Sequence, residues 1–170
     1  MTAHPVPTAP LSLAQLVEWT ACVAEDVRAG LYAVEADADH RWHVRLHREN
    51  EVDVWLISWT TDQGTQLHDH GGSAGAFTVV SGELSETIWT PGVEQLADTP
   101  RHEGDTVVFG ENYVHDVRNT LPGTAVSVHA YSPPLSLMNY YDVEGHELVR
   151  LASIWTDDPE EPTPALRAAS

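Results

Sequence analysis

The sequence predicts an all-β domain, a small antiparallel β-barrel or jelly roll, with one helical segment at its N-terminal end. Two observations lead to this prediction. An amphipathic pattern at helical spacing occupies the N-terminal part of the chain. From residue 53 onward the period changes to two, in short stretches rich in β-branched and aromatic residues that end at turn residues. Many short strands after one helical segment are typical of an antiparallel barrel or sandwich.

The helical segment is expected over residues 13–29. Ser12, with Gln15 three positions later, forms a capping-box pattern at its start, and Gly30 is a natural stop. The single cysteine, Cys22, lies among apolar residues of this segment, so we expect a buried, inert thiol. One cysteine also excludes an intramolecular disulfide and a cysteine-based zinc site.

The expected strands follow in order along the rest of the chain. They cover residues 53–59, 76–80, 84–89, 106–109, 125–131 and 147–154, and the Ser81-Gly82 turn joins the second to the third. The length of 170 residues, of which 42% are hydrophobic, indicates one domain with a core of its own. We assign this domain to residues 11–156, between a flexible N-terminus (1–10) and an acidic, proline-rich flexible tail (157–170).

The charge of the chain limits its partners. A formal charge of −18, from 26 acidic and 8 basic residues, repels phosphate backbones and anionic lipids, so neither nucleic acid nor a membrane is an expected partner. The chain has no apolar run of about 18 residues, and its start lacks the basic and apolar segments of a secretory signal. We therefore expect a cytoplasmic protein, a monomer or a weak homo-oligomer.

Two of the ten histidines stand out, His68 and His70. Residues two apart on an extended chain point to the same side, so both imidazoles face one way. Neutral imidazole nitrogens are ligands for first-row metal ions. A His-x-His pair by itself is a weak signal, because such pairs are common by chance.

A second segment, residues 104–119, strengthens the metal hypothesis. It places His115 after an expected strand and a glycine-containing turn, with Asn119 four positions later. Together with the His-x-His pair, this segment resembles the two sequence motifs of the cupin superfamily, which implies the cupin fold. Gly82 stands at the glycine position of the first motif, whereas Gly75 stands where that motif has a carboxylate.

Without that carboxylate, the resemblance implies a metal bound by three neutral histidines, His68, His70 and His115. This set is similar to that of the cysteine dioxygenase type I family, the thiol dioxygenases among the cupins, and above all to its bacterial members. The likeness runs from about residue 41 to 141 and implies one Fe²⁺ per chain. In animal members the position of Gly75 holds a cysteine that is cross-linked to the active-site tyrosine, so no Cys-Tyr cross-link is expected here.

The stretch Ser127-Val-His129-Ala-Tyr131, followed by Ser-Pro-Pro, looks like the family's Ser-His-Tyr relay. The same grouping follows from geometry, because alternate residues of a strand share a face. A phenol beside an imidazole that a hydroxyl orients can hold or steer a proton. The alternative is a buried polar ladder that only satisfies its own hydrogen bonds.

Arg45 lies where the family carries an arginine for the substrate carboxylate, and a guanidinium can hold a carboxylate through two parallel hydrogen bonds. Arg41 and Arg48 lie nearby, and a surface arginine is the alternative role for Arg45.

The function that the resemblance implies is the oxidation of L-cysteine by dioxygen to cysteine sulfinic acid. 3-Mercaptopropionate or another small thiol is the second candidate substrate. Two other classes stay open: a zinc enzyme, because three histidines and a water also form a hydrolytic site, and a non-catalytic metal-binding cupin that senses or binds a small molecule.

Overall fold

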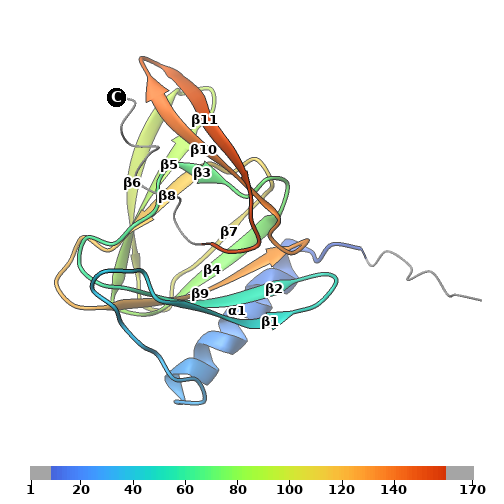
Figure 1. Ribbon diagram of the computed structural model, residues 1–170, viewed down its shortest axis with the longest axis vertical. Helices are drawn as coiled ribbons and strands as arrows, with labels where there is room; N and C mark the ends of the chain where they lie inside the picture. The colour runs from blue at the N-terminus through green and yellow to red at the C-terminus, as the bar shows by residue number, and fades with distance from the viewer. Residues whose placement is uncertain (1–8, 160–170) are drawn as a thin grey trace, which may run out of the picture.

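The computed structural model describes residues 9–159, which form two antiparallel β-sheets and one helix (Figure 1). The predicted fold class is confirmed. The elements are α1 (Leu13–Arg28), β1 (His43–Arg48), β2 (Asp53–Trp59), β3 (His68–Asp69), β4 (Ala74–Ser81), β5 (Glu83–Thr90), β6 (Gln95–His102), β7 (Thr106–Phe109), β8 (His115–Arg118), β9 (Ala125–Ser132), β10 (Leu137–Glu144) and β11 (Glu147–Trp155).

The two sheets have the strand orders β1-β2-β9-β4-β7 and β11-β10-β3-β8-β5-β6. Figure 1 shows α1 against the outer face of the first sheet, on the side away from the second. Helix α1 contacts β4, β9 and β7. One apolar cluster therefore lies between the two sheets, and a second lies between the first sheet and the helix.

This layering explains why β2 is buried at every residue. Val54 and Leu56 belong to the cluster beneath the helix, whereas Trp55, Ile57 and Trp59 belong to the cluster between the sheets. Successive side chains of a strand point to opposite faces, and here both faces are covered. Strand β9 is buried throughout in the same way. Its inward positions are the ones that can reach a site in the barrel interior.

Helix α1 begins where the capping box predicts. The Ser12 side chain accepts a hydrogen bond from the backbone N–H of Gln15, and the Gln15 side chain accepts one from the backbone N–H of Ser12. The prediction for Cys22 is wrong, because its side chain is exposed. The stripe from Leu16 to Val27 faces the sheet at helical spacing, and Cys22 points to the other side.

The six strands predicted from their apolar content are all present, but five others are not among the predictions. These are β1, β3, β6, β8 and β10. Strand β3 has two residues and β8 has four, and polar or charged residues dominate most of the five. In such strands, pairing with neighbours far along the chain supplies the stability, so local composition gives little signal.

Of the residues assigned to the flexible tail, Asp157 and Asp158 form ion pairs with β1, and Pro159 accepts a hydrogen bond from Arg41, which precedes β1. The predicted domain bounds, residues 11–156, stay a prediction. The other residues of the tail, and residues 1–8 of the predicted N-terminal segment, lie outside the described part of the chain.

Candidate metal centre

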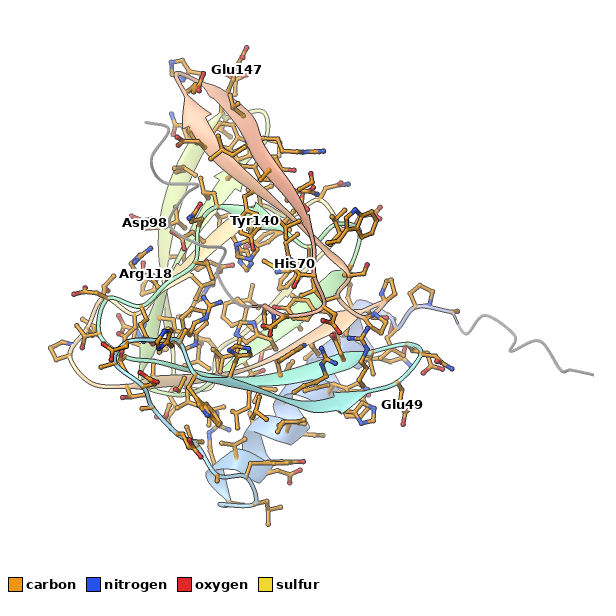
Figure 2. The ribbon with its side chains drawn as sticks, viewed as in Figure 1. Glu49, His70, Asp98, Arg118, Tyr140 and Glu147 are labelled. Carbon is orange, nitrogen blue, oxygen red and sulfur yellow. The ribbon has the colours of Figure 1, made fainter. Side chains whose placement is uncertain are left out.

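Three histidines meet between the two sheets. His68 and His115 are paired across β3 and β8, and His70 lies just after β3. One nitrogen from each ring lies within 4.8 Å of the others, and all three side chains are buried. Figure 2 shows His70 near the centre of the molecule. The structure thus brings together the three residues that the sequence predicts as ligands.

Hydrogen bonds fix two of the three rings. Nδ1 of His68 lies 2.6 Å from the carbonyl oxygen of Gln66, and Nδ1 of His115 lies 2.8 Å from Oε1 of Glu86. An acceptor at Nδ1 holds the proton there and leaves Nε2 free to bind a metal. Nδ1 of His70 is buried and makes no hydrogen bond to any residue between 9 and 159.

Two of the three histidines, His68 and His70, are held neutral, as metal ligands must be. Burial, followed by the charge that His115 would carry, lowers the pKa of His68 well below its ordinary value. Burial lowers the pKa of His70 in the same way. Closely spaced, buried imidazoles of this kind fit a divalent first-row metal ion.

Glu86 anchors the third ligand. Its side chain is fully buried on β5, where it accepts hydrogen bonds from His115 and from the Tyr113 hydroxyl at 3.0 Å. Its other oxygen pairs with Arg101 at 2.7 and 2.8 Å. Burial acts to raise the pKa of Glu86, but the His115 and Arg101 hydrogen bonds outweigh it and the pKa is lowered. Sequence reasoning did not assign this network, although Glu86 follows Gly82 and Leu84 in the family-like pattern.

Asp69 fixes the turn between the first two ligands. Its Oδ1 accepts hydrogen bonds from the Gly71 N–H at 2.8 Å and from the Asn139 amide at 2.7 Å, and its Oδ2 accepts one from the Tyr141 hydroxyl at 2.6 Å. Strand β10 therefore holds the loop that carries His70. This role was not predicted, and only the position of Asp69 inside the His-x-His motif hints at it.

The predicted relay forms a connected chain in the structure. Ser127 Oγ lies 2.8 Å from Nε2 of His129, and the Tyr131 hydroxyl lies 3.4 Å from its Nδ1. The indole of Trp59 donates a hydrogen bond to Ser127 Oγ at 2.8 Å. Sequence reasoning missed Trp59, whose inward position on β2 follows from the period of two.

Electrostatics keep the relay neutral. Burial lowers the pKa of His129 to about 3 and raises the pKa of Tyr131 above its ordinary value. His129 is thus a neutral imidazole and Tyr131 a protonated phenol near pH 7. The Tyr131 and His70 ring centroids are 4.8 Å apart, so the relay adjoins the histidine cluster.

Gly75 sits opposite Tyr131 in the pairing of β4 with β9. A side chain at this position would place its Cβ 2.5 Å from the ring of Phe109, which fills the space. Phe109 stacks on His70 with ring centroids 4.9 Å apart. The missing side chain at Gly75 therefore allows an aromatic ring to support the second ligand.

A small cavity borders the cluster. Its wall is made of Arg41, Ile57, Trp59, Thr65, His68, His115, Val117, His129, Tyr131, Met138 and Pro159. Arg45 is not part of this wall, as far as the described residues go. Its guanidinium lies 4.5 Å from the centre of the Trp55 ring and pairs with Asp157 at 3.0 Å, while its Nε is buried without a hydrogen-bond partner among residues 9–159.

A protein-family model, cysteine dioxygenase type I, matches residues 25–144. The chain belongs to this family. A curated relative, cysteine dioxygenase type 1 of Danio rerio, is 26% identical over 118 residues, which cover 62% of this chain and 58% of that protein. The match to this cysteine dioxygenase thus spans less than two thirds of the relative's length.

Solved structures place this cysteine dioxygenase family member in the cupin fold. A double-stranded β-helix protein from Klebsiella pneumoniae superposes with a TM-score of 0.51 at 17% identity, covering 74% of this chain and 90% of its own. An RmlC-like cupin from Desulfovibrio desulfuricans superposes with a TM-score of 0.51 at 19% identity, covering 61% of this chain and 92% of its own. The family and fold implied by the sequence resemblance are confirmed. Among the described residues, no helix has the length and apolar character needed to cross a membrane.

Proposed function

We propose that this chain is a thiol dioxygenase that holds one Fe²⁺ on His68, His70 and His115 and oxidises L-cysteine to cysteine sulfinic acid. The observation that carries the proposal is the juxtaposition of this buried histidine cluster with the Tyr131 relay: His68, His115, His129 and Tyr131 line one cavity, and the His70 ring lies beside Tyr131. Membership of the cysteine dioxygenase type I family supports the same reaction class.

The reaction balances without a further reductant, since a thiolate and dioxygen give a sulfinate with both oxygen atoms on sulfur. When bound, ferrous iron supplies the redox chemistry that dioxygen requires and open coordination positions beside the three imidazoles. The apolar wall beside the cluster, which includes Ile57, Val117 and Met138, limits the access of water.

Tyr131 and His129 would control protons at this site. The raised pKa of Tyr131 keeps its hydroxyl protonated, so it acts as a hydrogen-bond donor toward a substrate beside the cluster. His129 accepts or donates at the phenol according to its tautomer, and Ser127 with Trp59 holds the other side of its ring. The relay therefore orients the phenol rather than storing a charge.

Arg45 remains the proposed partner of the substrate carboxylate. Its buried Nε, which has no partner among the described residues, is a donor that a carboxylate could use. Its pairing with Asp157 would have to open first, because that carboxylate now contacts the guanidinium. If Arg45 acts in this way, thiols with a carboxylate are preferred, with L-cysteine first and 3-mercaptopropionate second. A cytoplasmic location and a monomer or weak homo-oligomer stay predictions.

Oxygen uptake by the iron-loaded full chain tests the function directly. L-Cysteine, 3-mercaptopropionate and cysteamine are supplied in turn, and the products are identified by mass spectrometry. We expect dioxygen consumption only with a thiol, and a sulfinate as the product. If no thiol stimulates oxygen uptake at full iron loading, the protein is not a thiol dioxygenase, and activity with zinc in place of iron would favour a hydrolytic cupin.

Two variants separate an enzyme from a binding module. Tyr131→Phe is expected to lower turnover roughly tenfold or more with iron still bound, whereas His115→Ala is expected to lose stoichiometric iron. An unchanged rate in Tyr131→Phe would remove the relay from the mechanism, and full iron binding by His115→Ala would refute the three-histidine site.

A further inference from the structure

The cavity beside the histidine cluster is too small for the proposed substrate. Its volume is about 20 Å³, which is room for about one water molecule. An amino acid such as cysteine does not fit, so part of the wall has to move when a thiol enters. The wall residues outside the paired strands are the ones whose movement disturbs the sheets least.

Most of the wall belongs to paired strands, but Arg41, Thr65 and Pro159 do not. Thr65 is tied to β8, because its N–H donates to the carbonyl of Val117 and its hydroxyl donates to Asp116 at 2.8 Å. Arg41 precedes β1 and Pro159 follows β11. The two are in contact, because Arg41 Nη2 donates a hydrogen bond to the carbonyl of Pro159. Side chains also hold the segment Asp157 to Pro159 on β1: Asp157 contacts Arg48 at 2.9 Å as well as Arg45, and Asp158 lies 2.8 Å from His43 Nε2.

The charge of Arg41 acts inside the cavity. Its guanidinium lies 4.8 Å from the centre of the Trp59 ring and donates to the carbonyl of Gly64 at 3.3 Å. Burial is the main cause of the lowered pKa of His129, and Arg41 adds to the lowering. The guanidinium of Arg45, in contrast, acts on the carboxyl groups of Asp53 and Asp157.

We infer that Arg41 is a second substrate-positioning residue, which binds the carboxylate of a thiol whose sulfur lies at the histidine cluster. The carbonyl of Pro159 is the group that the carboxylate replaces on Arg41 Nη2. A carboxylate is a stronger acceptor than a peptide carbonyl for a guanidinium, so the exchange is favourable. This inference rests on the proposed function for the position of the sulfur.

Replacement of the Pro159 carbonyl on Arg41 also affects Arg45, because both arginines contact the segment from Asp157 to Pro159. When the Pro159 carbonyl leaves Arg41, the adjoining Asp157 carboxylate is drawn away from Arg45. The same shift enlarges the cavity and gives the substrate carboxylate access to guanidinium donors at the inner wall and at the mouth. Arg41 contributes the inner donors, next to Trp59 and the relay.

A pair of thiols that differ only in a carboxylate tests this role. L-Cysteine and cysteamine are titrated by calorimetry into the iron-loaded full chain without dioxygen, so that binding is measured apart from turnover. Arg41→Gln is expected to weaken L-cysteine binding roughly 10- to 100-fold and to leave cysteamine binding within about twofold. Arg41→Lys, which keeps the charge, is expected to recover part of the loss.

Arg28→Gln is the matched control. Arg28 is also partly buried and donates to two backbone carbonyls, those of Val79 and Val80 at 3.1 Å, but it lies on the helix side of the sheet. This variant should bind both thiols like the wild type.

Equal weakening of both thiols by Arg41→Gln would assign a purely structural role to Arg41, and unchanged L-cysteine binding would also overturn the inference. So would a wild-type chain that binds cysteamine as tightly as L-cysteine. If L-cysteine binds with this Arg41 dependence but no sulfinate forms in air, the dioxygenase proposal fails and the role of Arg41 stands.

Discussion

Replacing Glu86 by glutamine tests how the protein holds its third ligand. The Glu86 carboxylate is fully buried and carries the only negative charge in direct contact with His115 and Arg101 among the described residues. Glutamine keeps the size of the side chain and one acceptor oxygen, but it removes the charge. Its amide group would also set a donor against another donor, on Arg101 or on His115.

The expected loss of stability in Glu86→Gln follows from the burial of the Glu86 carboxylate and from the partners that it would leave. Removing one member of a buried ion pair costs about 3–5 kcal/mol, because the other charge is left uncompensated. The Arg101 side chain is 22% exposed and can regain some hydration, so we expect a loss of about 2–4 kcal/mol. In a domain of this size that loss lowers the melting temperature by about 5–15 °C. The looser His115 ring should weaken metal binding about 10- to 100-fold.

Two measurements and one control decide the outcome. Thermal melts of the metal-free chain give stability, and competition with a chelator gives the affinity for Fe²⁺. Glu83→Gln on the same strand is the control, because Glu83 pairs with His102 at an exposed site, and it should change both quantities little. If Glu86→Gln melts within about 2 °C of the wild type and binds iron with unchanged affinity, the Glu86 carboxylate neither stabilises the fold nor holds the His115 ring.

Three further predictions concern the layers around the site. Gly75→Ala should destabilise the fold by about 1–3 kcal/mol in chemical denaturation, because the added Cβ would lie 2.5 Å from the Phe109 ring. Gly110→Ala is the control, since the space around its Cβ is open. Equal stability of the two variants would contradict tight packing at Gly75. Ser127→Ala should cost about 1–3 kcal/mol by the same measurement, since the buried Trp59 indole loses its acceptor, and a loss below about 0.5 kcal/mol would mean that another acceptor replaces it. The pKa of the Asp157 carboxyl is lowered below 3.8, chiefly by its hydrogen bond from Arg45. The contribution of this carboxylate to the contact with β1 is therefore present above pH 3.8 and is lost as the pH falls through the lowered pKa. A carboxyl NMR titration should show this lowering, and it should be reduced in Arg45→Gln; an identical titration in that variant would assign the shift to another group.

The sequence could predict the fold class because burial in this protein follows simple periods. The stretch from Asp53 to Trp59 is rich in β-branched and aromatic residues and is buried at every position, as expected of a strand covered on both faces. The helix start at Ser12 is equally local, because a capping box involves neighbours in the chain. The short polar strands β3 and β8 could not be found in this way, since their stability comes from partners far along the sequence.

The candidate site likewise combines features that are local in the sequence with contacts that are not. His68 and His70 are two residues apart, so their shared direction is a local property, and so is the common face of Ser127, His129 and Tyr131. The partner groups that orient them are not local. Glu86 lies 29 residues from His115, and Trp59 lies 68 residues from Ser127.

The sequence by itself thus predicted the barrel and the shared face of Ser127, His129 and Tyr131, because strand period is a property of short stretches of chain. It predicted the grouping of His115 with His68 and His70 through the resemblance of two motifs to those of the family. Only the tertiary structure decided that Cys22 faces outward and that Arg41, rather than Arg45, forms the wall of the cavity. The direction of a side chain on the rim depends on what packs against it, and here that is the segment from Asp157 to Pro159, more than a hundred residues away. Such contacts depend on the register of the folded sheets, which local patterns do not specify.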